Sequence, residues 1–329
     1  MAMKTHLALA ALAALGATNA NAKTTITTFD PQGSVGTQAV SINNGAITGY
    51  YEDSSSVYHG FVRASDGTIT SFDPQGSERT YAWSINNGAI TGYYADSTNT
   101  THGFVRTADG TITSFDPAGS ILTAAITING KGAITGEYED SSKVYHGFLR
   151  ASDGAFTTFD PSGSTSTTGI AINDSGVIAG DYTNGSVPLV YHGFVRAADG
   201  TITTFDPSGS TGTYPSCINK EGVIVGFYGN SSYDDVGFMR SPDGTITSFT
   251  VPAATETAAY SIDDKGNITG NYDDKNFVVH GFLLRPNGTF QKFDPSGSVD
   301  TWGRGVSKGA VTGYYLDSNY VYHGYLRSK

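Results

Sequence analysis

Residues 81–116 read YAWSINNGAITGYYADSTNTTHGFVRTADGTITSFD, and this stretch decides the fold. It contains four short segments, residues 81–86, 89–94, 102–107 and 111–116, which are rich in Thr, Ile, Val and aromatic residues. Such residues suit a pleated strand better than a helix. Asn-Gly separates the first two segments and Ala-Asp-Gly the last two, and both sequences favour tight hairpins. The stretch therefore predicts four consecutive antiparallel strands.

The same pattern recurs through the chain. Most units end in a longer polar connection such as Asp-Pro-Gln-Gly-Ser, whose proline cannot donate to a strand ladder. About 44 residues with four strands and one crossover connection describe a propeller blade. We predict an all-β fold, a seven-bladed β-propeller with four antiparallel strands per blade; the alternative, an open β-solenoid, needs shorter rungs and dedicated caps. His-Gly-Phe and its variants begin 43 to 46 residues apart, at His59, His102, His146, His192, Val236, His280 and His323.

The two ends of the chain are expected to complete one blade together. Residues 24–30 match the fourth strand of a unit and residues 322–328 the third strand, so neither terminal unit is whole alone. Pairing of the N-terminal with the C-terminal strand closes a ring and removes exposed sheet edges. We therefore expect a single propeller domain over residues 23–329.

Charge and the N-terminal residues indicate the compartment. The net charge of −11 argues against binding to nucleic acid or to anionic membranes. Lys4 and His6 precede the apolar residues 7–15, and Ala-Asn-Ala follows at 20–22, a pattern typical of a secretory signal peptide over residues 1–22. This apolar run is too short to span a bilayer, which needs about 20 residues in a helix. We predict a secreted monomer, extracellular or periplasmic, without membrane insertion.

The repeat resembles the bacterial family described as extracellular HAF repeats, named for a His-Ala-Phe core. The resemblance rests on His59-Gly60-Phe61 and its copies, which have glycine as the middle residue, on the preceding Gly-Tyr-Tyr motifs such as residues 49–51, and on the Asn-Asn-Gly turns. The likeness spans residues 23–329. It implies export and a repeat scaffold, and it identifies no catalytic residues.

Six histidines at equivalent positions are expected to pair with aspartates. Counting outward from the hairpin loop at residues 65–67 places Gly60 opposite Phe72 and the preceding histidine opposite an aspartate. In the fifth unit Val236 replaces His and Thr250 replaces Asp, the joint loss that a direct hydrogen bond predicts. A metal role is disfavoured, because histidines in separate blades do not converge on one ion. The expected pairs are His59 with Asp73, His102 with Asp116, His146 with Asp160, His192 with Asp206, His280 with Asp294 and His323 with Asp30.

The loop-rich face is the candidate binding surface, because loops on a rigid scaffold usually carry function. Flat aromatic side chains beside polar groups suit sugar rings, so we predict Tyr81, Tyr214, Trp302 and Arg304 as ligand-binding residues. Packing of one blade on the next is the alternative role for these aromatic residues. Alternation along the strand predicts that Trp83 belongs to the core. The ring position on which this prediction rests varies among the repeats and reads Gln38, Tyr81, Ala124, Thr168, Tyr214, Ala258 and Trp302.

Catalytic and metal chemistry have weaker signals. Glu78 and Glu256, expected in crossover loops, and Arg304 near the mouth are the candidate catalytic residues, because two carboxylates and a cation can cleave a glycosidic bond. No nucleophile elbow, zinc-ligand spacing or phosphate loop is present in the sequence. Loop carboxylates such as Asp53 suit Ca²⁺ but match no defined calcium loop, so a solvated acidic rim is the alternative; no other cofactor is expected. Cys217, the only cysteine, stands where other repeats carry serine and is predicted to be a small core residue.

Three functions follow from these patterns. The favoured one is a secreted propeller that binds an extracellular ligand, a carbohydrate above all, without catalysis. The second is a polysaccharide lyase or glycoside hydrolase on the same scaffold, and the third is a cell-surface scaffold that binds protein.

Overall fold

The computed structural model describes residues 24–329, and the predicted signal peptide lies outside them. Over the described residues the chain consists of 28 β-strands and no helix, and hence contains no helix that could cross a membrane. In chain order the strands are β1 Thr25–Phe29, β2 Ser34–Asn43, β3 Ala46–Asp53, β4 Tyr58–Arg63, β5 Ile69–Phe72, β6 Ser77–Asn86, β7 Ala89–Asp96, β8 Thr101–Arg106, β9 Ile112–Phe115, β10 Ser120–Ile128, β11 Ile134–Asp140, β12 Tyr145–Arg150, β13 Phe156–Phe159, β14 Ser166–Ile172, β15 Ile178–Thr183, β16 Tyr191–Arg196, β17 Ile202–Phe205, β18 Gly212–Ile218, β19 Ile224–Gly229, β20 Asp235–Arg240, β21 Ile246–Phe249, β22 Glu256–Ile262, β23 Ile268–Asp273, β24 Val279–Leu284, β25 Phe290–Phe293, β26 Ser298–Ser307, β27 Ala310–Asp317 and β28 Tyr322–Ser328.

Pairing groups the strands into four-stranded antiparallel units. Five units are separate sheets, and two are joined into an eight-stranded sheet by a single parallel pair, Tyr145 with Ser166. The predicted all-β fold with four antiparallel strands per repeat is confirmed. We number the units along the chain: unit 1 is β2–β5, unit 2 is β6–β9, unit 3 is β10–β13, unit 4 is β14–β17, unit 5 is β18–β21, unit 6 is β22–β25, and unit 7 is β26–β28 together with β1.

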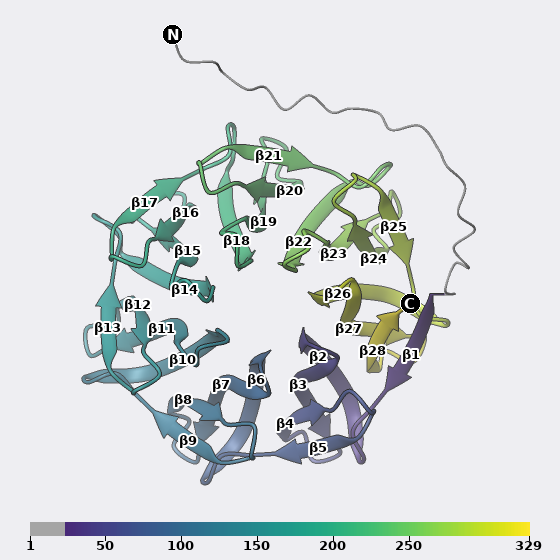
Figure 1. Cartoon of the computed structure of the whole chain (residues 1–329), viewed down its shortest axis with the longest axis horizontal. Coiled ribbons are helices and arrows are strands. Elements are labelled where there is room, and N and C mark those ends of the chain that lie inside the picture. The colour runs from purple at the N-terminus through teal and green to yellow at the C-terminus, as the bar shows by residue number, and fades with distance from the viewer. Residues whose placement is uncertain (1–23) are drawn as a thin grey trace.

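The units are arranged radially. In Figure 1 the first strand of each unit, such as β2 or β6, lies nearest the central axis, and the fourth, such as β5 or β9, lies at the periphery. Unit 7 takes its fourth strand from the N-terminal end of the described chain. There β1 pairs antiparallel with β28, from Thr25 opposite Ser328 to Phe29 opposite Gly324. Strands from the two ends of the sequence thus share one sheet.

Two predicted loop residues lie in strands instead. β6 starts at Ser77 and not at residue 81, because its pairing with β7 continues past a β-bulge at Glu78 to the pair of Ser77 with Asp96. Glu256 is the first residue of β22. The prediction that Glu78 and Glu256 lie in crossover loops is therefore wrong.

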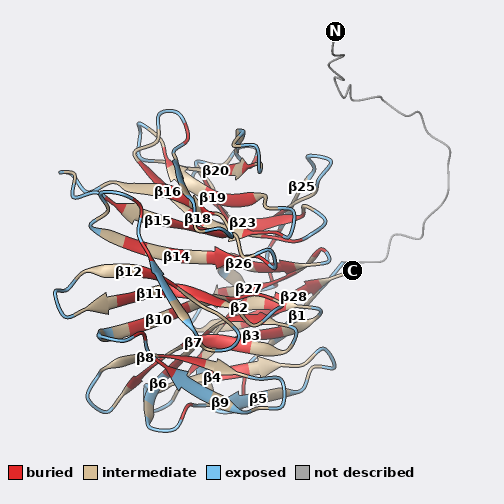
Figure 2. Cartoon of the chain, turned by 60° about the vertical axis from the view of Figure 1, so that its left-hand side comes forward, coloured by how far each residue is buried: buried red, intermediate tan, exposed pale blue. Residues whose placement is uncertain are grey.

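The core is formed by the repeated motif and lies between neighbouring units. Phe72 of unit 1 packs edge-on against Phe104 of unit 2 with ring centroids 6.0 Å apart, and the guanidinium of Arg106 lies 5.1 Å above the Phe72 ring. Figure 2 shows buried segments along the strands and exposed loops at their ends. The aromatic residue of each His-Gly-Phe or variant motif is fully buried; these residues are Phe61, Phe104, Phe148, Phe194, Phe238, Phe282 and Tyr325.

The predicted histidine–aspartate pairs are confirmed. His59 Nδ1 lies 2.7 Å from Asp73 Oδ2, and the other five predicted pairs have the same contact at 2.7 to 2.9 Å. Gly60 faces Phe72 as predicted, and the Phe72 ring lies so close that a Cβ on Gly60 would approach it to 2.8 Å. Each histidine therefore joins the third strand of a unit to the connection that follows its fourth strand.

A loop aspartate in each of five units closes a turn. Asp53 Oδ1 accepts hydrogen bonds from the backbone N–H groups of Ser55 and Val57, at 2.8 and 3.0 Å, and these bonds hold its pKa below the usual value. Its Oδ2 lies 3.5 Å from His59 Nε2. Equivalent aspartates in four other units make the same contacts. These carboxylates close turns, and residues 24–329 contain no group of three or more His, Cys, Asp or Glu side chains placed to hold a metal ion.

Candidate functional site

Each innermost strand carries a β-bulge midway along its pairing with the second strand. In unit 2 the register shifts between Ala82 and Ser84, so Trp83 has no partner across the ladder. A bulge bends the strand and turns its extra residue out of the alternating pattern. The extra residues of the seven units, which we call the bulge ring, are Val40, Trp83, Ile126, Ile170, Ser216, Tyr260 and Arg304.

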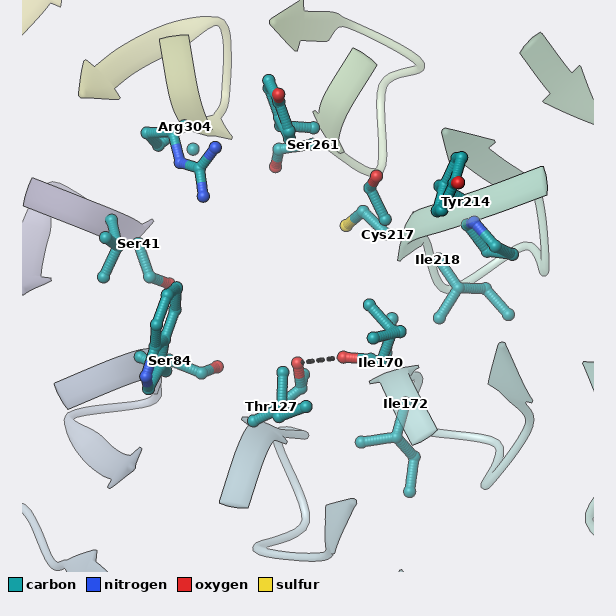
Figure 3. Close-up of a pocket in the computed structure, with 18 of the residues that line it drawn as sticks. Ser41, Ser84, Thr127, Ile170, Ile172, Tyr214, Cys217, Ile218, Ser261 and Arg304 are labelled. Carbon is teal, nitrogen blue, oxygen red and sulfur yellow. Dashed lines mark hydrogen bonds between the residues drawn. The ribbon is translucent and has the colours of Figure 1, made fainter. Parts of the chain in front are cut away.

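Every member of the bulge ring lines one central cavity of about 500 Å³. Figure 3 shows side chains of the innermost strands arranged around this space, with Arg304 and Tyr214 on different sides. Tyr93, Glu137 and Phe227, from the second strands, contribute to the wall. The cavity thus places aromatic faces, a carboxyl group and a guanidinium group around one space, a composition typical of small-molecule sites.

Where the residue after the bulge is serine, it holds neighbouring units together. Ser41 Oγ accepts a hydrogen bond from the backbone N–H of Ile85 in the next unit, at 3.2 Å, and two further units repeat this contact. Cys217 occupies the same position in unit 5, where its Sγ lies 3.8 Å from the carbonyl oxygen of Ile262. Burial raises the pKa of the Cys217 thiol, which keeps it protonated. Cys217 therefore serves as a small residue of the cavity wall and is not an activated nucleophile.

Two carboxyl groups with raised pKa values lie on the second strands of units 3 and 4. Glu137 accepts a hydrogen bond from Thr168 Oγ1 at 2.7 Å, and Asp181 is the residue opposite Thr168 in the strand ladder. Burial raises the pKa of Asp181 to about 7, and the negative charge of Glu137 adds to this effect. Burial also raises the pKa of Glu137, against the lowering effect of the Thr168 hydrogen bond. The pair is suited to hold a proton near neutral pH.

Arg304 supplies a positive charge to the cavity wall. Its guanidinium lies 4.3 Å above the ring of Tyr260, within the range of a cation–π contact. Burial raises the pKa of Tyr260, and the charge of Arg304 offsets this only in part. This part of the wall is therefore shielded from water, which strengthens polar contacts to a bound molecule.

The structure separates the four predicted ligand-binding residues. Tyr214 and Arg304 line the central cavity, whereas Tyr81 and Trp302 do not. Tyr81 packs against Tyr50 of unit 1, with ring centroids 5.1 Å apart, and Trp302 stacks on an aromatic residue of its own unit. Packing between and within units accounts for these two contacts, and a ligand contact of Tyr81 or Trp302 stays a prediction.

The predicted catalytic residues do not share the cavity. Arg304 lines it, but neither Glu78 nor Glu256 does. Glu78 is exposed, whereas Glu256 has a pKa raised by partial burial and then by the charges of Asp235 and Asp273. A catalytic role for the two glutamates stays a prediction that this cavity does not support.

Sequence reasoning missed Trp83, Glu137 and Asp181. Strict alternation along β6 predicts Trp83 in the core, and this prediction is wrong because the bulge changes the phase of the strand at that residue and Trp83 lines the cavity. Glu137 and Asp181 had a usable signal, since they occupy a position that varies among near-identical repeats. After the glycine of Ile-Thr-Gly and its variants, the seven units carry Tyr50, Tyr93, Glu137, Asp181, Phe227, Asn271 and Tyr314.

Comparisons with known proteins establish the fold. No family model and no curated protein matches the chain. The streptogramin B lyase structure superposes with a TM-score of 0.60 at 10% identity, over 93% of this chain and 98% of that one. The β-propeller domain of the Trilobed protease from Pyrococcus furiosus gives 0.63 at 8% identity, over 89% and 96%. Puromycin hydrolase gives 0.60 at 12% identity, over 88% of this chain and 51% of that one. The chain has a β-propeller fold, and at these identities the likeness says nothing of its ligand.

Proposed function

We propose that the protein is a secreted, closed, seven-bladed β-propeller that binds a carbohydrate in its central cavity. The observation that carries the proposal is the bulge ring, which places seven side chains of six different types around one space on a repetitive scaffold. These residues have no partner in the strand ladder. Their side chains can therefore differ without disturbing strand pairing and are available to contact a ligand.

The chemistry of the wall suits a sugar. Trp83 and Tyr93 bring aromatic rings to the wall, and the apolar side of a sugar ring stacks on such rings. Glu137 accepts hydrogen bonds from sugar hydroxyls, and Arg304 donates hydrogen bonds to sugar oxygens. A volume of about 500 Å³ accommodates a ligand of one to a few sugar rings.

Ring closure is supported by contacts between units 7 and 1. Arg63 of unit 1 lies 5.1 Å above the ring of Phe29 in β1, and Arg106 of unit 2 lies 5.1 Å above Phe72 of unit 1. The junction between the first and last units thus has the same contact as an ordinary junction. Together with the β1–β28 pairing, this supports a ring of seven equivalent blades.

The compartment is the second part of the proposal. The signal-like pattern of residues 1–22 and the resemblance to extracellular HAF repeats support secretion of a monomer whose ligand is an extracellular glycan. Detection of the mature chain, beginning at Lys23, outside the cytoplasm tests this part.

The test of ligand binding is a glycan array followed by calorimetric titration of the purified protein. We expect one glycan site per chain and a loss of affinity of about tenfold or more for Trp83→Ala, the usual effect of truncating an aromatic anchor. Trp302→Ala is the matched variant, because this tryptophan is absent from the cavity wall. A weaker binding by Trp302→Ala with no effect of Trp83→Ala would move the site to the mouth. Failure to bind any glycan, with capture of a protein partner instead, would favour the scaffold function.

A second candidate function, cleavage of a glycosidic bond, rests on Glu137, the one carboxyl group of residues 24–329 that lines the central cavity. Burial raises the pKa of Glu137, and a carboxyl group with a raised pKa is suited to act as a general acid; Asp181 lies beside it but is absent from the cavity wall. The assay is release of reducing ends or of unsaturated sugars from polysaccharides that the array identifies. A loss of turnover in Glu137→Gln that exceeds its loss of binding would support catalysis, and absence of any product from the unmodified protein would reject it.

A further inference from the structure

A second cavity lies on the face formed by the tight hairpin turns, where units 6, 7 and 1 meet. Its volume is about 570 Å³. Its wall contains Lys265, Arg285, Lys308 and Lys329 and no Asp or Glu side chain. In a chain with a net charge of −11, this concentration of positive charge is local.

Unit 6 departs from the other units at this cavity. Asn267 stands where the others carry Ala or Val, Arg285 where they carry Ala, Thr or Ser, and Gln291 where they carry Thr. The three replacements contact one another. Arg285 Nη1 donates to Asn267 Oδ1 at 3.1 Å, and Arg285 Nη2 donates to Gln291 Oε1 at 3.4 Å. Asn267 and Gln291 therefore both bond to Arg285, and the three replacements form one group at one point of a repetitive scaffold.

A second arginine converges on the same neutral acceptor. Arg327 Nη2 donates to Gln291 Oε1 at 3.0 Å, so two guanidinium groups share one amide oxygen. Arg327 is only 5% exposed, and its Nη1 has no hydrogen-bond partner within residues 24–329. Burial and then the charge of Arg285 lower the pKa of Arg327. Gln291 is neutral, so it does not balance the positive charges of the two guanidinium groups that donate to it.

The carboxylate of Asp263 is already occupied by other donors. Asn267 Nδ2 donates to both of its oxygens at 3.0 and 2.9 Å, and the backbone N–H groups of Lys265 and Gly309 each donate at 2.9 Å. These bonds hold two turns together and leave Asn267 Oδ1 directed at Arg285. Within residues 24–329 the lysine ion pairs involve Lys143 and Lys220, and none involves a cation of this cavity.

We propose that this cavity binds the sulfate or phosphate group of a small, sugar-sized molecule. A tetrahedral oxyanion accepts charge-assisted hydrogen bonds from Arg285, Lys265 and Lys308 and adds negative charge to a wall in which cationic side chains outnumber the nearby carboxylates. The cavity is larger than one such ion, so it has room for the molecule that carries the group. The acidic remainder of the protein repels long polyanions, which favours a small ester. This site is separate from the central cavity and does not depend on the carbohydrate proposal.

Calorimetric titration of the whole mature protein at low ionic strength tests the site. The probes are inorganic sulfate, inorganic phosphate, a hexose 6-sulfate and a hexose 6-phosphate, with chloride and the uncharged hexose as negative controls. We expect both esters to bind more tightly than the free ions, and the tighter ester identifies the source of the oxyanion. Arg285→Gln and Lys265→Gln should each weaken ester binding about tenfold, the effect of losing one charge-assisted hydrogen bond.

Lys131→Gln is the matched control, because Lys131 occupies the turn position of Lys265 in unit 3, away from the cavity. It should leave ester binding unchanged, as should Trp83→Ala in the central cavity. Absence of ester binding tighter than about 10 mM would overturn the proposal, as would an equal loss in Lys131→Gln, which would show a general charge effect. If Arg285→Gln fails to fold, as judged by circular dichroism, the exposed Lys308→Gln replaces it with the same expectation.

Discussion

Replacement of Asp181 by Asn is expected to stabilise the protein at neutral pH and to have much less effect in acid. Burial and the neighbouring Glu137 raise the pKa of Asp181 from 3.8 to about 7. Between these values the unfolded chain has lost the proton and the folded chain keeps it, so the folded state binds more protons. The free energy of unfolding therefore falls as pH rises from about 4 to 7, and the cost persists above pH 7.

The magnitude follows from the same two values. Each pH unit between them corresponds to about 1.36 kcal/mol, so ionisable Asp181 lowers the free energy of unfolding by about 4 kcal/mol at pH 7.5 and by only about 1 kcal/mol at pH 4.5. An asparagine of the same shape does not titrate. The stability difference between Asp181→Asn and the unmodified protein should thus increase by about 3 kcal/mol over this pH range.

Urea unfolding of both proteins at pH 4.5, 5.5, 6.5 and 7.5, followed by circular dichroism, measures this difference. Asp66→Asn is the control of opposite sign, because hydrogen bonds from Thr68 lower the pKa of the exposed Asp66. That variant should gain no stability at neutral pH. A difference between Asp181→Asn and the unmodified protein that stays constant from pH 4.5 to 7.5 would refute the reasoning, since it would mean that Asp181 is ionised in the folded state throughout.

Two further predictions concern the scaffold. A double-mutant cycle on His146→Ala and Asp160→Ala should give a coupling of about 1 kcal/mol at pH 6. Burial opposes protonation of His146, but the hydrogen bonds and charges of Asp160 and Asp140 together raise its pKa. The coupling is therefore present at low pH and shrinks by pH 8. Additive effects at pH 6 would contradict the contact. Gly136→Ala should lower the free energy of unfolding by about 2 kcal/mol or more, because the added Cβ would lie 2.0 Å from the carbonyl oxygen of Ala124. Gly36→Ala, whose Cβ would meet nothing within 4 Å, should leave thermal unfolding unchanged; equal effects of the two glycine variants would show that the backbones separate easily.

The parts of the fold that depend on local pairing could be predicted from the sequence. The pairing of His59 with Asp73 follows from counting residues outward from a three-residue hairpin, because nothing interrupts the ladder between β4 and β5. The same holds for Gly60 opposite Phe72. A tight turn fixes the register of its two strands, so a short sequence is enough to place their side chains.

The candidate site could not be predicted in the same way, because a bulge interrupts the count. The residues on either side of Trp83 pair with consecutive residues of β7, so Trp83 is an extra residue in its strand. No residue type in the sequence marks the bulge, because the seven units carry side chains as different as serine, tryptophan and arginine at this position. Strict alternation therefore assigned Trp83 to the core. The approach of Glu137 to Thr168 depends on how units 3 and 4 pack, which spacing within one repeat does not encode.

The bulge also explains how a repetitive scaffold can carry one specific site. The residue before it in unit 2, Ala82, is fully buried, and the residue after it, Ser84, accepts a hydrogen bond from the backbone of unit 3. Both are constrained by neighbouring units, so their replacement leaves a void or an unsatisfied polar group. Trp83 between them faces the cavity and has no partner in the ladder. A change of side chain at this position alters the cavity wall without changing a pair of the strand ladder. The ligand can therefore be determined by bulge positions, while the paired positions on either side hold the scaffold together.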